Sequence, residues 1–333
     1  MKRYMIILLL ILPLFLILLP ALLVRYFSSG EPSNLPSGAQ IGNRAVQTQQ
    51  IPIQVYREQK QQIETVPLET YIEGVVSAEM PAEFELEALK AQAMAARTYI
   101  FKRLYEGRFS DVPKGAQVSD TVKHQAYMDI QQRKERWGEQ YEWKAKKIKQ
   151  AVNETAGIIL TYRGEPIDAT FFATSNGFTE NADEYWDKQI PYLRSVASPW
   201  DIESPRFEER VTLSIAELEE KLGVRLEAQA ASRGTWYQVL DTTTGNRIGR
   251  IRIGGKEFTG REIREKLGLN SSSFTMRLSQ KQVMITTRGY GHGVGMSQWG
   301  ANGMAKSGNN AEQIVKYYYQ GITLQSYNQV KRG

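Results

Sequence analysis

Residues 83–104 read EFELEALKAQAMAARTYIFKRL and carry the strongest helical pattern in the chain. Apolar side chains recur there at nearly helical spacing and predict a helix with one buried face, formed by Leu86, Leu89, Ala93, Met94, Ile100 and Leu104. Lys90 and Arg97 lie about 10 Å apart along this helix, beside the apolar stripe. Cations on a buried stripe need partners. Two interpretations have equal weight: structural salt bridges, or a pocket shared with Glu79 that orients this glutamate or binds polar substrate groups.

The residues around this helix alternate between strand and helix patterns. IPIQVY at 51–56 predicts a strand, and Pro67 marks a helix start. A long polar helix is expected over 125–155. The segments 157–162 and 167–174, separated by a turn at 163–165, predict a β-hairpin.

The sequence pattern changes after Pro199, where short predicted strands alternate with short charged helices. Strands are expected at 207–213, 236–241 and 247–253, and helices at 214–222 and 259–267. Ser214 and Thr259 are predicted N-caps, each followed three residues later by a glutamate. The fold class is therefore α+β: a mixed α/β catalytic domain over 51–198 plus 286–326, with a smaller α+β module, 199–285, inserted in it.

The N-terminal region predicts a membrane anchor. Residues 5–24, MIILLLILPLFLILLPALLV, carry no charge and are long enough to cross a bilayer. An uncleaved anchor is favoured over a signal peptide, because no small-x-small cleavage site precedes Arg25. We expect a cytoplasmic tail at 1–4, a transmembrane helix, a flexible linker at 25–50, and a body outside the membrane.

Composition excludes several classes of function. The 333 residues contain no cysteine and two histidines, so a disulfide scaffold, a thiol nucleophile and a thiolate metal site are ruled out. The net charge is +6, but three of the cations, Lys2, Arg3 and Arg25, flank the apolar segment. The rest of the chain is nearly balanced, so nucleic acid is not an expected partner.

Three segments carry candidate chemistry. Glu79 lies in the apolar stretch VVSAEMP, where desolvation would raise its pKa and suit a general acid, although an ordinary surface glutamate is the commoner case. In RGYGHGVGMSQWGA, at 288–301, His292 is a base, a metal ligand or a residue that fixes the loop through hydrogen bonds. Tyr290 and Trp299 either stack on sugars or pack in the core. In TSNGFTE, at 174–180, Ser175 and its polar neighbours suit carbohydrate recognition or form a simple turn.

Together these segments resemble the stage II sporulation protein D family. The resemblance rests on VPLExYIxGVV before EMP, on LKAQA followed by ARTY, on TSNGxTE, and on GHGVGMSQWGA, and it extends from about residue 50 to 326. It implies a lytic transglycosylase that cleaves the β-1,4 bond between N-acetylmuramic acid and N-acetylglucosamine and leaves a 1,6-anhydro end. The family's catalytic glutamate falls on Glu79, and its important basic and polar residues fall on Lys90, Arg97, Thr179 and Tyr192. We add Ser175 and His292 as substrate-binding candidates.

The resemblance also implies a setting. Such proteins act on peptidoglycan between the mother-cell and forespore membranes during engulfment. Their partners are an amidase, stage II sporulation protein P, and a membrane protein, stage II sporulation protein M. Some members hold zinc through a Cys…His-Cys set, but Val118, Lys123 and His124 occupy those places here. We therefore expect no metal and no cofactor.

A single glutamate can serve as acid and then as base in this chemistry, because the muramoyl 6-hydroxyl attacks internally. Glu73 and Glu83 flank Glu79, so hydrolysis by a carboxylate pair stays open. The main alternative is a non-catalytic peptidoglycan-binding protein that activates a partner amidase. A zinc amidase fails on the number of available ligands.

Overall fold

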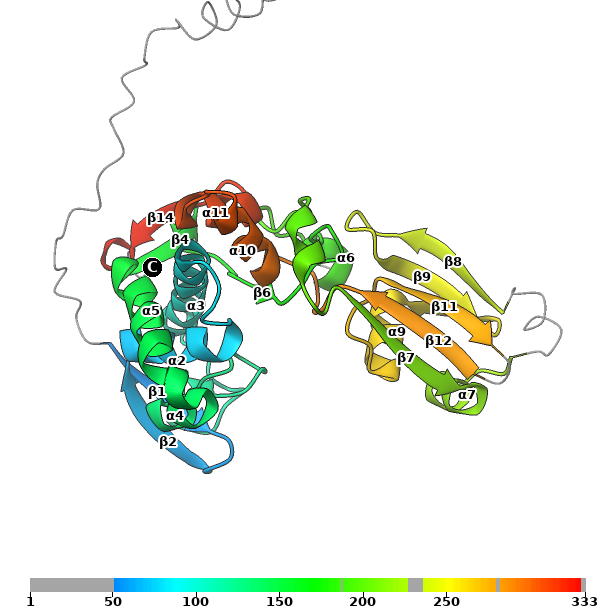
Figure 1. Ribbon diagram of the computed structural model, residues 1–333, viewed down its shortest axis with the longest axis horizontal. Helices are drawn as coiled ribbons and strands as arrows, with labels where there is room; N and C mark the ends of the chain where they lie inside the picture. Colours follow the sequence, from blue (N-terminus) through cyan, green and yellow to red (C-terminus); the bar gives the residue numbers. More distant parts are fainter. Residues whose placement is uncertain (1–50, 187, 227–235, 280–281, 331–333) are drawn as a thin grey trace, which may run out of the picture. The chain divides into compact units, whose positions relative to one another are not determined.

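The computed structural model describes residues 51–330, except 187, 227–235 and 280–281. The anchor predicted at 5–24 and the linker predicted at 25–50 lie outside these residues. No helix in the described part of the chain combines the length and the apolarity needed to cross a membrane. The described chain is a mixture of helices and short strands, as the α+β prediction requires (Figure 1).

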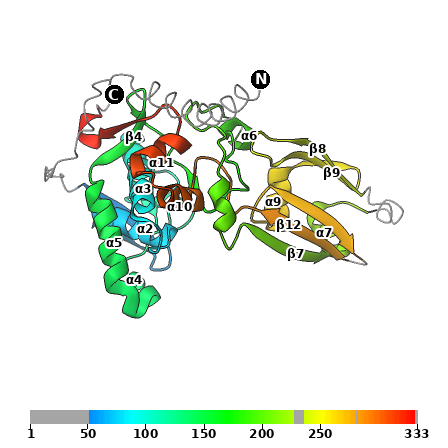
Figure 2. The ribbon, with the colours of Figure 1, turned by 45° about the horizontal axis from the view of Figure 1, so that its top comes forward.

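The predicted central helix is present as α3 (Leu86–Glu106), whose main neighbours are four other helices and a strand. These neighbours are α2 (Leu68–Glu79), α5 (Tyr141–Glu154), α10 (Gln298–Lys306), α11 (Ala311–Tyr318) and β4 (Ile158–Tyr162). Figure 2 shows them around α3 from a second direction. Because α3 has neighbours on several sides, its small residues are buried as fully as its large ones.

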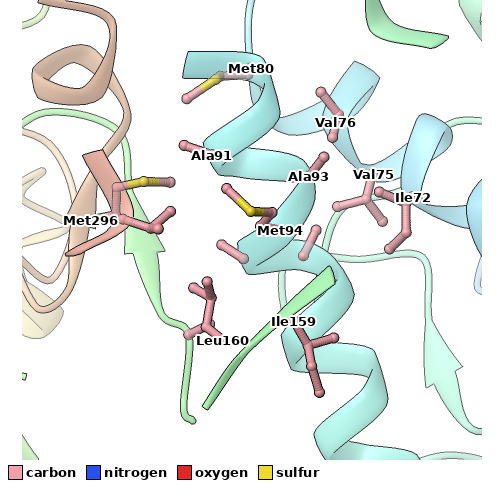
Figure 3. Packing of buried hydrophobic residues seen from close by; sticks show 14 of the residues in the cluster. Ile72, Val75, Val76, Met80, Ala91, Ala93, Met94, Ile159, Leu160 and Met296 are labelled. Carbon is pink, nitrogen blue, oxygen red and sulfur yellow. The ribbon is translucent and has the colours of Figure 1, made fainter. Parts of the chain in front are cut away.

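The core around α3 is formed by short side chains on the helix and larger ones from its neighbours. Ala91, Ala93 and Met94 of α3 are all buried. Figure 3 shows Ile72, Val75 and Val76 of α2 on one side of the helix and Met296 on another. The alanines allow a close approach of the neighbouring helices, so α2, which ends at Glu79, is held rigidly against α3.

The strands of this larger core form three small sheets. Their remaining members are β1 (Pro52–Arg57), β2 (Gln62–Pro67), β3 (Val118–Ser119), β5 (Glu165–Pro166), β6 (Phe171–Phe172), β13 (Met296–Ser297) and β14 (Thr323–Ser326). The sheet orders are β2-β1-β3, β14-β4-β5 and β13-β6. The hairpin predicted over 157–174 is only partly present, because β4 pairs with the two-residue β5 while β6 pairs in parallel with β13. The chain between β5 and β6 thus leaves the hairpin to join the glycine-rich segment.

The single helix predicted over 125–155 is wrong. Two helices occupy the segment, α4 (Ile130–Trp137) and α5, joined by a 3-10 turn at Gly138–Gln140. Asp129 caps α4 by accepting a hydrogen bond from the Gln132 N–H at 2.8 Å. Gly138 ends α4 with φ 50°, a conformation that glycine adopts without steric cost. Residues 125–129 belong to no helix or strand and bond to α2 through Glu79 and Gly74.

A second, separate cluster of buried apolar side chains lies between Val211 and Ile285. It contains two three-stranded sheets, β11-β12-β7 and β10-β9-β8, with two helices. These elements are β7 (Glu208–Ser214), α7 (Ile215–Leu222), β8 (Tyr237–Thr242), β9 (Ile248–Ile253), β10 (Lys256–Thr259), α9 (Gly260–Leu267), β11 (Phe274–Ser279) and β12 (Gln282–Arg288). Both predicted N-caps are confirmed, since Ser214 and Thr259 each form a capping box with the glutamate three residues later.

Candidate functional site

Glu79 is the last residue of α2, and its carboxylate faces a cavity of about 390 Å³. Its Oε1 accepts a hydrogen bond from the Ala126 N–H at 2.8 Å. Distant parts of the chain form the walls, which comprise Tyr99, Val122, His124, Gln125, residues 169–173, residues 290–292 and Gln298. Glu79 is the one carboxylate among the described residues that line this cavity.

Burial controls the proton affinity of Glu79. Loss of solvent raises the pKa of its carboxyl group above the usual value, and the hydrogen bond from Ala126 opposes this rise. No cation is among the groups that set this pKa. The carboxyl group is thus prepared to hold a proton and release it to a buried acceptor, which is what a general acid does.

His292 lies in the same cavity, on the segment between β12 and β13. Its ring contacts Phe172, Tyr185 and Trp186, with centroid separations of 5.6, 5.9 and 5.3 Å. Its Nδ1 accepts a hydrogen bond from the Val294 N–H at 3.0 Å. Burial, with the charges of Arg264 and Arg247, lowers the pKa of His292 to about 4. The ring is therefore neutral at pH 7 and is not an acid there.

The glycines beside His292 allow this placement. Gly291 has φ 119°, and a Cβ there would lie 2.7 Å from the Phe172 Cβ. Gly293 has φ 88°, and a Cβ there would collide with the Arg247 guanidinium group. The loop thus packs its backbone directly against β6 and against Arg247. Its glycines serve close packing, and the histidine ring is held in the cavity wall.

A hydrogen-bond network behind the cavity holds the segment that supports Glu79. His124 Nε2 lies 2.9 Å from Asp111 Oδ2, and its Nδ1 lies 2.7 Å from Ser119 Oγ. Arg103 also binds Asp111, at 2.8 Å. The order Ser–His–Asp is that of a hydrolase triad, but Ser119 is 3% exposed and is not part of the cavity wall. The network instead fixes the chain two residues before Ala126.

The structure does not bring Lys90 and Arg97 to Glu79. Arg97 is fully buried, and its guanidinium group donates to Glu69 at 2.7–3.2 Å and to the carbonyls of Val152 and Ile158. Lys90 forms ion pairs with Glu87 and Glu154. The α3 residue that lines the cavity is Tyr99, about 200° around the helix from Arg97. Helical phase therefore directs both cations to structural carboxylates, the first of the two interpretations.

Three other predicted site residues also lie outside the cavity wall. Ser175 is fully buried and donates to Asp201 at 2.9 Å. Thr179 Oγ1 accepts from the Val196 N–H at 2.8 Å, and Tyr192 OH donates to Asp168 at 3.2 Å. These bonds shape the loops that follow β6. Of the seven predicted residues, Glu79 and His292 line the cavity.

Gln125 is a cavity residue that the sequence analysis missed. It is 1% exposed, and its Oε1 accepts from Tyr71 OH at 3.4 Å. Its Nε2 has no hydrogen-bond partner among the described residues. An isolated glutamine belongs to no sequence motif. Its position in the cavity follows from the tertiary structure, in which the next residue, Ala126, donates a hydrogen bond to Glu79. The described residues contain no group of three or more His, Asp or Glu that could hold a metal ion.

Comparisons of the sequence with known proteins identify its family. The SpoIID family model, described as Stage II sporulation protein, matches residues 56–162, which include Glu79 and α3. The stage II sporulation protein D of Bacillus subtilis is 48% identical over 283 residues, covering 85% of this chain and 81% of that protein. The chain belongs to the stage II sporulation protein D family. The protein of the same name from Bacillus amyloliquefaciens is also 48% identical, over 82% of this chain and 78% of that protein.

A more distant relative bears a different name. The amidase enhancer of Bacillus subtilis is 27% identical over 314 residues, covering 77% of this chain and 40% of that protein. Family membership supports a role for the chain in sporulation. The name of the enhancer adds activation of an amidase to the glycan cleavage that the sequence led us to expect.

Proposed function

We propose that the protein is a lytic transglycosylase that cleaves peptidoglycan glycan strands. One observation carries the proposal: a single desolvated carboxyl group, Glu79, lies in a cavity with no second carboxylate among its described lining residues. A typical glycoside hydrolase needs two carboxylates. One is the general acid, and the other either activates a water molecule or attacks the sugar as a nucleophile. Lytic cleavage needs one, because the nucleophile is part of the substrate.

The reaction takes two proton transfers through Glu79. The protonated carboxyl group gives its proton to the glycosidic oxygen as the bond to C1 of N-acetylmuramic acid breaks. The resulting carboxylate then accepts the proton of the muramoyl 6-hydroxyl as that oxygen bonds to C1. The product has a 1,6-anhydro end, and Glu79 is protonated again. Phe171, Phe172 and Tyr290 supply apolar walls for sugar rings.

The cellular setting belongs to the same proposal. A segment at 5–24 anchors the chain in the membrane, and the body acts on peptidoglycan between the mother-cell and forespore membranes. Stage II sporulation proteins P and M are the proposed partners. An amidase partner is chemically consistent, since removal of stem peptides would give bare glycan to an enzyme that cuts between sugars.

The decisive experiment is mass spectrometry of the products that the full-length chain releases from glycan strands without peptides. We expect anhydro-muramoyl ends from the wild type and at least a thousandfold loss of cleavage in Glu79→Gln. The matched control is Glu83→Gln, because Glu83 is exposed and pairs with Lys144 outside the cavity. It should cleave within threefold of the wild type. Reducing ends in place of anhydro ends, or cleavage by Glu79→Gln, would contradict the mechanism.

The second candidate function is activation of an amidase without cleavage, and the similarity to the amidase enhancer favours it. It predicts no anhydro products from the wild type. It also predicts that Glu79→Gln stimulates the partner amidase on intact peptidoglycan as strongly as the wild type does. The two assays together therefore separate the candidates.

A further inference from the structure

The positive charge of the body is concentrated on α4 and α5. Residues 130–150 contain seven basic and three acidic side chains. Two of the lysines are already engaged: Lys144 pairs with Glu83, and Lys147 donates to the Phe84 carbonyl. Lys146 and Lys149 are exposed and have no hydrogen bond or ion pair to any residue that the structure describes. These two cations are available to an external anion.

A groove of about 680 Å³ runs between α4, α5 and α2, and these lysines line it. Trp143 is 44% exposed on its wall, and Ile130 is 51% exposed. Arg133 also lines the groove although its side chain is 4% exposed. It forms an ion pair with Glu73, which lines the same groove, at 3.7 Å. Its Nε has no hydrogen-bond partner among the described residues. Two carboxylates, those of Glu73 and Glu142, also line the groove. The groove thus combines exposed apolar area with three cations and two anions, and Lys146 and Lys149 supply its excess of positive charge.

The groove is connected to the Glu79 cavity by a short segment that belongs to no helix or strand. Gln125 lines the cavity, and Ile130 lines the groove. Between them the Ala126 N–H bonds Glu79 and the Met128 N–H bonds the Gly74 carbonyl at 3.2 Å, so the segment follows α2. Five residues of extended chain span at most about 17 Å. A polymer held at Glu79 therefore reaches the groove within a few sugar units.

We propose that this groove, formed by Arg133, Trp143, Lys146 and Lys149 with their neighbours, binds the free carboxylates of the stem peptides carried by the glycan strand. The proposal rests on the proposed peptidoglycan substrate and adds a subsite for its peptide part. Cations that line a hollow fit a flexible anionic peptide that enters it. A flat lipid surface would instead meet cations on a projecting face. The groove is the reason that peptide-bearing strands would bind more tightly than bare ones.

The test measures binding in the absence of cleavage. The full-length Glu79→Gln chain, in a non-ionic detergent, is co-sedimented with intact sacculi and with sacculi stripped of peptides by an amidase. The groove variant is Lys146→Glu/Lys149→Glu. The matched control is Lys221→Glu/Lys266→Glu, which changes the net charge equally on exposed residues of α7 and α9. Thermal melts of both variants provide the folding control.

We expect the groove variant to bind intact sacculi about fivefold to tenfold more weakly, with the difference fading as salt is raised. Binding to stripped sacculi should change by less than twofold, and the control variant should match its parent on both substrates. Trp143→Ala should weaken binding to intact sacculi in the same direction. Equal loss on both substrates, or no loss on intact sacculi, would overturn the proposal.

A second measurement addresses lipid as the partner. Hydrogen exchange of residues 130–150 is followed in nanodiscs with and without anionic phosphatidylglycerol, and with added peptide-bearing muropeptides. Protection by the muropeptides supports the proposal, and protection by the anionic lipid alone refutes it. Neither assay requires turnover. A chain that binds as expected but yields no anhydro products would therefore refute the proposed enzyme while the peptide groove stands.

Discussion

Replacing Arg97 with methionine should destabilise the fold without weakening substrate binding. The guanidinium group is fully buried and donates to both oxygens of Glu69 and to three backbone carbonyls. Methionine fills a similar volume but leaves the Glu69 carboxylate without its cation. Breaking a buried ion pair in this way costs about 3–5 kcal/mol. Because Glu69 keeps 22% exposure, we expect the lower end, about 3 kcal/mol.

The assay is thermal unfolding followed by circular dichroism. A loss of about 3 kcal/mol corresponds to a fall in melting temperature of roughly 6–12 °C for a domain of this size. The double variant Glu69→Leu/Arg97→Met removes both charges and should recover part of the loss, because no unpaired carboxylate remains. Lys90→Met is the control, and its partly exposed ion pairs should be worth less than about 1 kcal/mol.

Binding to sacculi tests whether Arg97 contacts the substrate. At a temperature below both transitions, Arg97→Met should bind sacculi within twofold of the wild type. A variant that melts like the wild type but binds tenfold more weakly would show that Arg97 contacts substrate. The assignment of Arg97 to the structural core would then be refuted.

Three further predictions concern the cavity. Burial raises the pKa of Glu79, so its carboxyl group stabilises the fold most at low pH and loses that contribution as pH rises through the raised pKa. The melting temperature of Glu79→Gln, relative to that of the wild type, should therefore be higher at pH 7 than at pH 4. The reverse order would contradict the burial of Glu79. Because the pKa of His292 is about 4, His292→Ala should leave measurable turnover and an unchanged pH profile between pH 5.5 and 8; a variant that melts normally but is as inactive as Glu79→Gln would place His292 in the catalytic set. The hydrogen bond from the Ala126 N–H lowers the pKa of Glu79, and His124→Ala should weaken this bond by loosening the segment that carries Ala126. The pKa of Glu79 and the alkaline limit of cleavage should therefore both rise. An unchanged limit would show that the His124 network does not act on Glu79.

Local interactions determined much of what could be predicted from the sequence. The capping boxes at Ser214 and Thr259 depend on residues three positions apart, and the helix α3 depends on helical spacing, so both were recovered. The single buried face predicted for α3 was wrong, because other elements pack around the helix on several sides. The apolar setting of Glu79 was also visible, because its neighbours along the chain supply much of it. The break at Gly138 was missed, since a glycine within a helical pattern is often tolerated.

Tertiary structure decided which candidates meet. The cavity joins the end of α2 to Tyr99, Gln125, Phe171 and His292, and no local pattern encodes contacts between segments so far apart. The partner of β6 is β13 rather than the adjacent strand, which brings the glycine-rich loop to Glu79. Arg97 and Tyr99 share one helix, yet their difference in phase directs one to a buried carboxylate and the other to the cavity. The sequence alone therefore proposed Glu79 as the acid, and long-range packing selected the residues that surround it.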